Sequence, residues 1–293
     1  MKLSARDIEH LAQVGLEAAF AAANFIALQS DQRHTTTLKT GVESLATQVV
    51  TAIDIKSQEI ILNLLEDSIS TYDLGLISEE LEDDQSRFTK DHFWCIDPLD
   101  GTLPFTEQRH GYAVSIALVN RTGESLIGIV VDPYHKKDYI AIKGRGCKVD
   151  GKSFQIDPVI NNKLVCHFDR SFVQSASYQS TLTQLEKIKE QLYLSELQTV
   201  TGSGAVMNAL SLLDNRFGCY VKLSKSKIGG GCIWDFAATS LIFEELGLYV
   251  SDSFGKPLKL NKKDSVYMNK EGVLFSSNSA LFKELINLAK FKE

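Results

Sequence analysis

Two long stretches near the N-terminus repeat apolar residues every three or four positions, as the buried face of a helix requires. The first predicts a helix over residues 5–29, with Ser4 and Asp7 spaced as in a capping box. The second predicts a helix over residues 45–66 that carries Asp54 near its middle. Residues 30–44 between them are polar and aperiodic, so we predict a mobile loop there.

Shorter apolar runs follow these helices and predict strands. After an acidic turn over residues 76–84, the run FWCI at 93–96 indicates a buried strand. Runs at 112–119, 126–131 and 138–143 are separated by short turns, a spacing typical of an antiparallel meander. The first half of the chain is therefore predicted to be α+β.

The second half alternates strands with helices. The predicted strands lie near 163–168, near 197–200, at the start of VKLSKSKIGGGC (221–232) and at 273–277. The predicted helices lie near 174–193, after Gly202–Gly204, over 234–247 and at the C-terminus. This alternation predicts an α/β half.

The chain shows neither an internal repeat nor a Pro-rich linker, so we expect both halves to pack as one unit. The predicted boundary lies near Gly151, between an α+β half at 1–150 and an α/β half at 151–293. We expect the first half to carry most metal ligands. The second half is expected to carry Asp235 and the loops that select substrate.

Composition narrows the class of protein. The chain has 293 residues, 44% hydrophobic and 23% charged, as is ordinary for globular proteins. It lacks a run of about 18 apolar residues and an apolar leader, which argues against a membrane protein or a secretory signal. Five scattered cysteines without a CxxC pair favour a reducing cytoplasm over a zinc or disulfide scaffold. The net charge of −6 argues against binding a nucleic-acid polymer.

The segment DPLDGT places two carboxylates, Asp97 and Asp100, at the end of the FWCI strand. A helix beginning after Gly101 would offer free amides to a phosphate. Two neighbouring carboxylates would repel that phosphate unless hard divalent cations lay between them. Carboxylate oxygens suit Mg²⁺, and two such ions would turn an acidic cluster into an anion clamp.

Other acidic residues could complete such a site. Glu79 and Glu80 precede the FWCI strand, Asp235 follows three glycines in the first turn of a helix, and Asp54 lies on the second helix. Each alone is typical of a solvated face or a helix-dipole match. Phosphatases with a DxDGT nucleophile motif are a poor fit, because here the two aspartates lie three positions apart.

The ordered set Asp54, Glu79-Glu80, DPLDGT (97–102) and WDFAA (234–238) resembles the inositol monophosphatase superfamily. Those enzymes are lithium-sensitive, Mg²⁺-dependent phosphomonoesterases, and they include 3′(2′),5′-bisphosphate nucleotidases. The resemblance covers roughly residues 51–257. It implies a layered αβαβα sandwich, commonly a homodimer.

The resemblance also implies roles for individual residues. Glu79, Asp97 and the Leu99 carbonyl would hold one Mg²⁺, Asp97, Asp100 and Asp235 a second, and a third ion would lie near Glu79. Thr102, with Glu79 or Asp54, would orient the attacking water, and the Gly101 and Thr102 amides would bind phosphate. Asp100 and Asp235 would also face the substrate.

Some features depart from the family pattern or stay open. Leu103-Pro104-Phe105 follows the motif and matches neither the inositol enzymes nor the nucleotidases closely. We expect Glu80 to be at most an outer-sphere residue. Arg109, His110, Lys225 and Lys227 are read as solvated loop residues, with a substrate contact left open.

The leading hypothesis is a Mg²⁺-dependent phosphatase that hydrolyses a small phosphomonoester, nominally inositol monophosphate. A 3′(2′),5′-bisphosphate nucleotidase is the alternative within the family. A non-catalytic metal- or phosphate-binding protein ranks lower because every predicted ligand and Thr102 are present. A purely structural interaction protein ranks last, since it leaves the ordered acidic residues unexplained.

Overall fold

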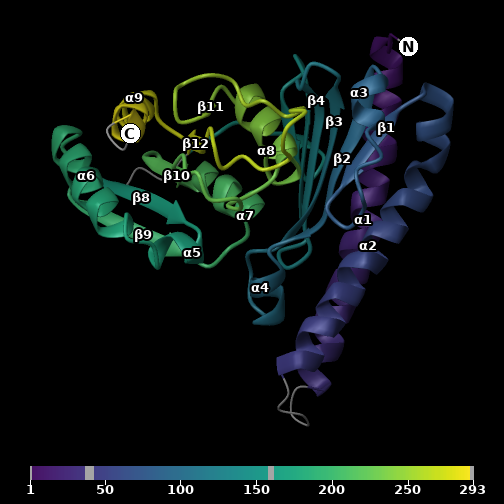
Figure 1. Ribbon diagram of the computed structural model, residues 1–293, viewed down its shortest axis with the longest axis horizontal. Coiled ribbons are helices and arrows are strands. Elements are labelled where there is room, and N and C mark those ends of the chain that lie inside the picture. Colours follow the sequence, from purple (N-terminus) through teal and green to yellow (C-terminus); the bar gives the residue numbers. More distant parts are fainter. Residues whose placement is uncertain (1, 37–42, 158–161, 291–293) are drawn as a thin grey trace.

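The computed structural model describes residues 2–36, 43–157 and 162–290. Helices cover both outer faces of two β-sheets and fill the space between them (Figure 1). The layers are formed by α1 (Ala5–Thr36) and α2 (Glu43–Tyr72) on one flank, α7 (Ala205–Leu210) and α8 (Ile233–Glu245) in the middle, and α6 (Tyr178–Gln191) and α9 (Ser279–Lys290) on the other flank. The predicted αβαβα sandwich is confirmed.

Within the described residues, the first sheet has seven strands in chain order. They are β1 (Gly75–Ser78), β2 (His92–Asp100), β3 (Ala113–Asn120), β4 (Ser125–Asp132), β5 (Lys137–Ile142), β6 (Cys147–Val149) and β7 (Lys152–Ser153). The antiparallel meander is confirmed for β3, β4 and β5. The prediction of an acidic turn at 76–84 is partly wrong, because its first residues, 76–78, belong to β1, which pairs in parallel with β2.

The second sheet has the strand order β11-β12-β10-β8-β9. Its strands are β8 (Lys163–Phe168), β9 (Glu196–Thr201), β10 (Gly218–Lys222), β11 (Tyr249–Ser251) and β12 (Val273–Ser276). Strands β9, β8 and β10 run parallel, whereas β12 and β11 are antiparallel additions. The sequence did not predict β11. Short helical turns complete the chain: α3 (Ser86–Thr89), α4 (Thr102–Thr106), α5 (Arg170–Val173) and η1 (Ser211–Asp214).

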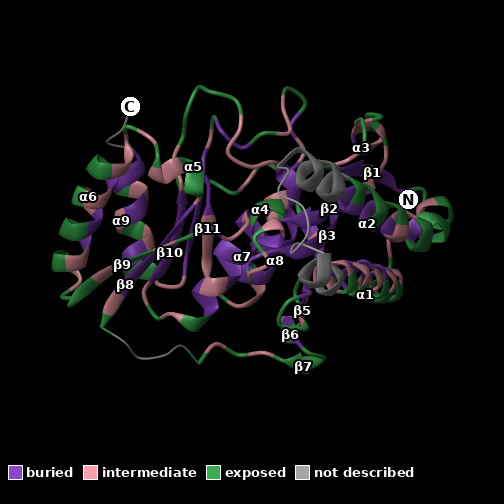
Figure 2. Cartoon of the chain, turned by 90° about the horizontal axis from the view of Figure 1, so that it is seen from below, coloured by how far each residue is buried: buried purple, intermediate pink, exposed green. Residues whose placement is uncertain are grey.

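Three apolar cores separate the layers. One lies between α1, α2 and the first sheet, one between the two sheets around α7 and α8, and one beneath α6 and α9. Figure 2 shows the buried residues gathered in the strands and in the central helices. Helix α8 contacts strands of both sheets, so the two parts of the chain pack together. The division near Gly151 stays a prediction.

The two N-terminal helices are longer than the sequence predicted. Helix α1 continues to Thr36 and α2 spans Glu43–Tyr72, while residues 37–42 of the predicted loop lie outside the described residues. The Ser4–Asp7 capping box is confirmed, since each backbone amide donates to the other side chain. By length and composition Ala5–Ser30 could also cross a membrane, but its apolar face is buried against the first sheet.

Candidate active site

Strand β2 carries a bulge that turns Asp97 and Asp100 toward the same side. Asp97 lies opposite Ser115 and Asp100 opposite Ala113, so three steps along β2 match two along β3. In a regular strand, residues three apart point to opposite faces. The extra residue corrects this, and Pro98 fits where the ladder is broken because it has no amide hydrogen. The Pro-Leu spacer therefore brings the two carboxylates together.

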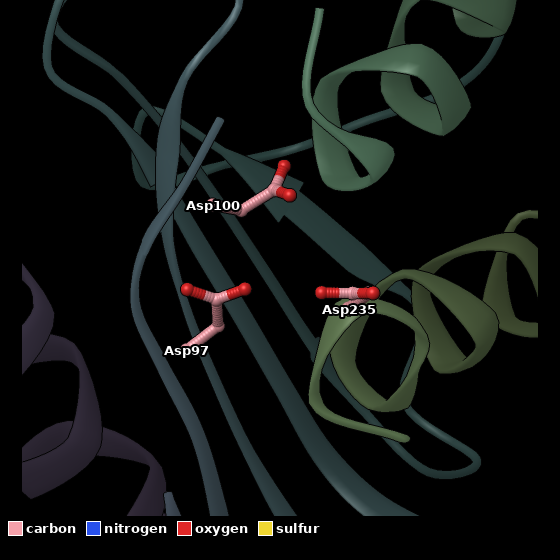
Figure 3. A group of neighbouring side chains, drawn as sticks. All are labelled: Asp97, Asp100 and Asp235. Carbon is pink, nitrogen blue, oxygen red and sulfur yellow. The ribbon is translucent and has the colours of Figure 1, made fainter. Parts of the chain in front are cut away.

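Asp235 completes a group of three carboxylates from the first turn of α8. One ligand oxygen from each of Asp97, Asp100 and Asp235 lies within 4.8 Å of the others. Figure 3 shows the three side chains converging from β2 and α8. The Cys232 amide donates to Asp235 Oδ2 at 2.7 Å, which fixes that carboxylate. At Gly231, a Cβ would lie 2.7 Å from the Phe236 ring, so glycine is needed beside Asp235.

Glu79 interacts with this group, and Asp54 lies on a helix that packs beside it. Glu79 follows β1, lies at the solvent edge of the site and shares a hydrogen bond with Asp97. Asp54 is buried on α2, and one turn further on Ser57 Oγ donates to the Pro98 carbonyl at 2.8 Å. This part of α2 therefore packs against the bulge. Asp54 is not a member of the three-carboxylate group, and its role in orienting water stays a prediction.

Asp100 also caps a distant helix. Its two carboxylate oxygens accept the amides of Ala205 at 3.0 Å and Val206 at 2.8 Å, at the start of α7. A Cβ on Gly204 would lie 2.3 Å from Asp100 Oδ2, so the side chain lies directly against the backbone. Sequence reasoning missed this contact, although Gly202–Gly204 did predict the helix start.

The carboxylates strongly perturb one another. Burial, followed by the charges of Glu79, Asp100 and Asp235, raises the pKa of Asp97 well above its usual range. Burial and the Asp235 charge likewise raise the pKa of Asp100, although the α7 amides oppose the shift. Loss of hydration and the Asp235 charge raise the pKa of Glu79 to about 7.

Such a cluster costs free energy unless a cation neutralises it. The donors are all carboxylate oxygens, which is the set that Mg²⁺ prefers. The residues present therefore fit a hard divalent cation.

The DPLDGT segment ends at a groove of about 440 Å³. Gly101 has φ +87°, and a Cβ there would lie 2.6 Å from the Gly111 carbonyl, so only glycine fits. Thr102 opens α4 and lines the groove together with Asp100 and Asp235. Leu99 is buried, and its amide donates to Asp97 Oδ1 at 3.1 Å. Metal binding by its carbonyl stays a prediction.

The residues whose roles were left open lie in different places. Arg109 pairs with Glu107 at 2.6 Å and donates to the Gly202 carbonyl, which ties α4 to the segment before α7. His110 lines a separate cavity of about 270 Å³. Lys225 and Lys227 line a pocket of about 450 Å³ that adjoins the groove.

Comparisons with known proteins show which sequences and structures this chain resembles. The model of the "Inositol monophosphatase family" matches residues 7–292. The chain is 28% identical over 252 residues to inositol monophosphatase 1 of Sus scrofa, covering 82% of this chain and 81% of that protein. It is 28% identical over 219 residues to the 3′(2′),5′-bisphosphate nucleotidase CysQ of Salmonella typhimurium, covering 74% and 81%. A solved inositol monophosphatase from Anabaena superposes with a TM-score of 0.70 at 18% identity, covering 98% and 97%.

Proposed function

Because the chain belongs to the inositol monophosphatase family of phosphomonoesterases, we propose that it hydrolyses a small phosphate ester with Mg²⁺. The observation that carries this proposal is the convergence of Asp97, Asp100 and Asp235 within 4.8 Å. They come from β2 and α8, more than a hundred residues apart in the chain. A fold that buries like charges so closely is explained by a cation between them.

We assign the ligands as the family resemblance implies. Glu79, Asp97 and the Leu99 carbonyl would hold one Mg²⁺, and Asp97, Asp100 and Asp235 a second, with a third ion near Glu79. When bound, the ions supply an activated water and stabilise the leaving oxygen.

The side chains and backbone amides of the protein orient the reactants. Thr102, with Glu79 or Asp54, orients the water, and the Gly101 and Thr102 amides position the phosphate. Such an arrangement, with ions that stabilise charge and protein groups that position the reactants, suits phosphoryl transfer, which depends on both.

Inositol monophosphate is the nominal substrate, supported by the similarity to the pig enzyme. A 3′(2′),5′-bisphosphate nucleotide is the second candidate. It is supported by the Salmonella relative and by the lysines of the pocket beside the groove. We also propose, from the resemblance and the scattered cysteines, a lithium-sensitive homodimer in the cytoplasm.

A phosphate-release screen tests the proposal. The purified protein is assayed with Mg²⁺ against inositol phosphates, nucleoside bisphosphates, sugar phosphates and histidinol phosphate, with a chelator as the control. We expect release from at least one class that stops when the metal is removed. Metal-independent release would refute the Mg²⁺ mechanism, and no release from any class would refute the proposed reaction.

A further inference from the structure

Gln58 is a buried glutamine on α2 whose side-chain amide contacts the segment around Glu79. The residue is only 4% exposed. Its Nε2 donates to the Glu80 carbonyl at 3.3 Å, and its Oε1 accepts the Ser78 hydroxyl. Because the Glu80 carbonyl can only accept, the amide nitrogen must lie on that side and the amide oxygen must face Ser78. A buried amide costs free energy unless it is hydrogen-bonded, and here both its oxygen and its nitrogen are.

These two contacts lie on either side of Glu79 in the chain. Ser78 is the last residue of β1 and is buried, whereas Glu80 lies in the turn that follows. The Glu79 amide itself donates to the Ile96 carbonyl of β2 at 3.2 Å. The chain is therefore fixed just before, at and just after Glu79, although Glu79 lies at the exposed edge of the site.

Glu79 needs such a restraint because its neighbours carry the same charge. It shares a hydrogen bond with Asp97, while the charges of Asp235 and Glu80 oppose its ionised form. An ionised carboxylate at the solvent edge lowers its energy by turning away from other carboxylates. It would then no longer face Asp97 when a cation arrives. Fixing the backbone on both sides of Glu79 limits this movement.

We propose that Gln58 is a positioning residue that keeps the Glu79 carboxylate beside Asp97 for the metal. This inference rests on the proposed function, since it takes Glu79 as a metal ligand. The adjacent residue of α2 acts on the other segment, because Ser57 Oγ donates to the Pro98 carbonyl at 2.8 Å, in the bulge that follows Asp97. One turn of α2 thus contacts both chain segments that would supply ligands on this side of the site.

Gln58→Leu tests the proposal, because leucine has a similar volume and can form neither hydrogen bond. If Glu79 then faces the site in only a fraction of the molecules, the apparent metal affinity falls by that fraction, and saturating metal restores the active arrangement. We expect the Mg²⁺ concentration for half-maximal phosphate release to rise about tenfold, the usual effect of losing a hydrogen-bond partner behind a metal site. At saturating Mg²⁺, kcat should be nearly unchanged. Ser78→Ala removes one of the two contacts and should give a smaller rise.

Ser68→Ala is the matched control for a purely structural effect. Ser68 is also buried on α2, about 15 Å along the helix from Gln58, and its Oγ accepts the Trp94 Nε1 hydrogen at 3.1 Å. Loss of this hydrogen bond should lower Tm but leave the Mg²⁺ dependence of the wild type. A Gln58→Leu protein that also melts earlier but keeps the wild-type Mg²⁺ dependence would overturn the proposal.

A second measurement needs neither metal nor turnover. In the metal-free protein, hydrogen–deuterium exchange of the peptide that contains the Glu79 amide reports how firmly this segment is fixed. Exchange should be faster in Gln58→Leu than in the wild type and unchanged in Ser68→Ala. Equal exchange in the wild type and Gln58→Leu would show that Gln58 does not restrain Glu79. If the wild type hydrolyses no phosphate ester, the proposed function fails, and the exchange rates still decide whether Gln58 fixes this segment.

Discussion

Asp97 is surrounded by three other carboxylates, so Asp97→Asn should stabilise the metal-free protein while removing nearly all of its activity. Glu79, Asp100 and Asp235 all raise its pKa, and ligand atoms of the aspartates lie within 4.8 Å. At an effective dielectric constant of about 20, one such pair costs about 3.5 kcal/mol. Proton uptake by the wild type relieves part of this repulsion. We therefore expect Asp97→Asn to raise the free energy of unfolding by roughly 2–4 kcal/mol at pH 8. Asparagine keeps an acceptor for the Leu99 amide, so the bulge is preserved.

Thermal melting at pH 8, with chelator and with Mg²⁺, measures both effects. Without metal, Tm should rise by roughly 4–8 °C in Asp97→Asn. At a Mg²⁺ concentration of about 100 times Kd, the free energy of unfolding of the wild type should rise by about 2.7 kcal/mol, and that of the variant should hardly change. Turnover should fall on the order of 10³-fold, about 4 kcal/mol of transition-state stabilisation.

Asp67→Asn, at an exposed position on α2, is the matched control and should change neither Tm nor turnover. A lower Tm for metal-free Asp97→Asn would refute the repulsion argument. Near-wild-type turnover would refute the role of Asp97 as a shared metal ligand.

Three further predictions follow from the same site. The folded-state pKa of Glu79 is raised from 4.5 to about 7, so its contribution to the stability of the metal-free protein should be present below pH 4.5 and lost as pH rises through 7. Without Mg²⁺, Tm should therefore fall as pH is raised across this window, and a rise in Tm would contradict the assignment. Millimolar Li⁺ should inhibit phosphate release, as the family resemblance implies, and indifference to Li⁺ at saturating Mg²⁺ would count against it. Thr102→Val should lower kcat about 10²-fold or more, the usual size of a proton-transfer contribution, while Mg²⁺-dependent melting is kept; loss of both would make Thr102 structural.

Long periodic segments could be predicted from the sequence, whereas short paired segments could not. Helix α8 and strands β3–β5 carry strong apolar patterns, and they lie where the sequence placed them. Strand β1 has only four residues, GLIS, and it is stable because it pairs with β2 and is mostly buried. Strand β11 is shorter still and depends on β12. Tertiary pairing decides such elements, and no local pattern reports it.

The residues of the candidate site that lie within a short sequence motif could be predicted. DPLDGT indicated Asp97 and Asp100, and the glycines before Trp234 indicated Asp235 at a helix start. The capping of α7 by Asp100 joins residues 105 and 106 positions apart. The pairing of Lys222 with Asp169 spans 53 positions. Neither contact has a sequence signature, because each depends on how the two sheets face the central helices.

The most direct test is a crystal structure of the protein soaked with Mn²⁺ and inorganic phosphate, with anomalous differences measured near the manganese edge. The account predicts anomalous peaks between Asp97, Asp100 and Asp235 and on the Glu79 side of Asp97, with a phosphate in the groove beside Thr102. Absence of anomalous scattering at these carboxylates at saturating Mn²⁺ would contradict the central claim that they converge to bind metal.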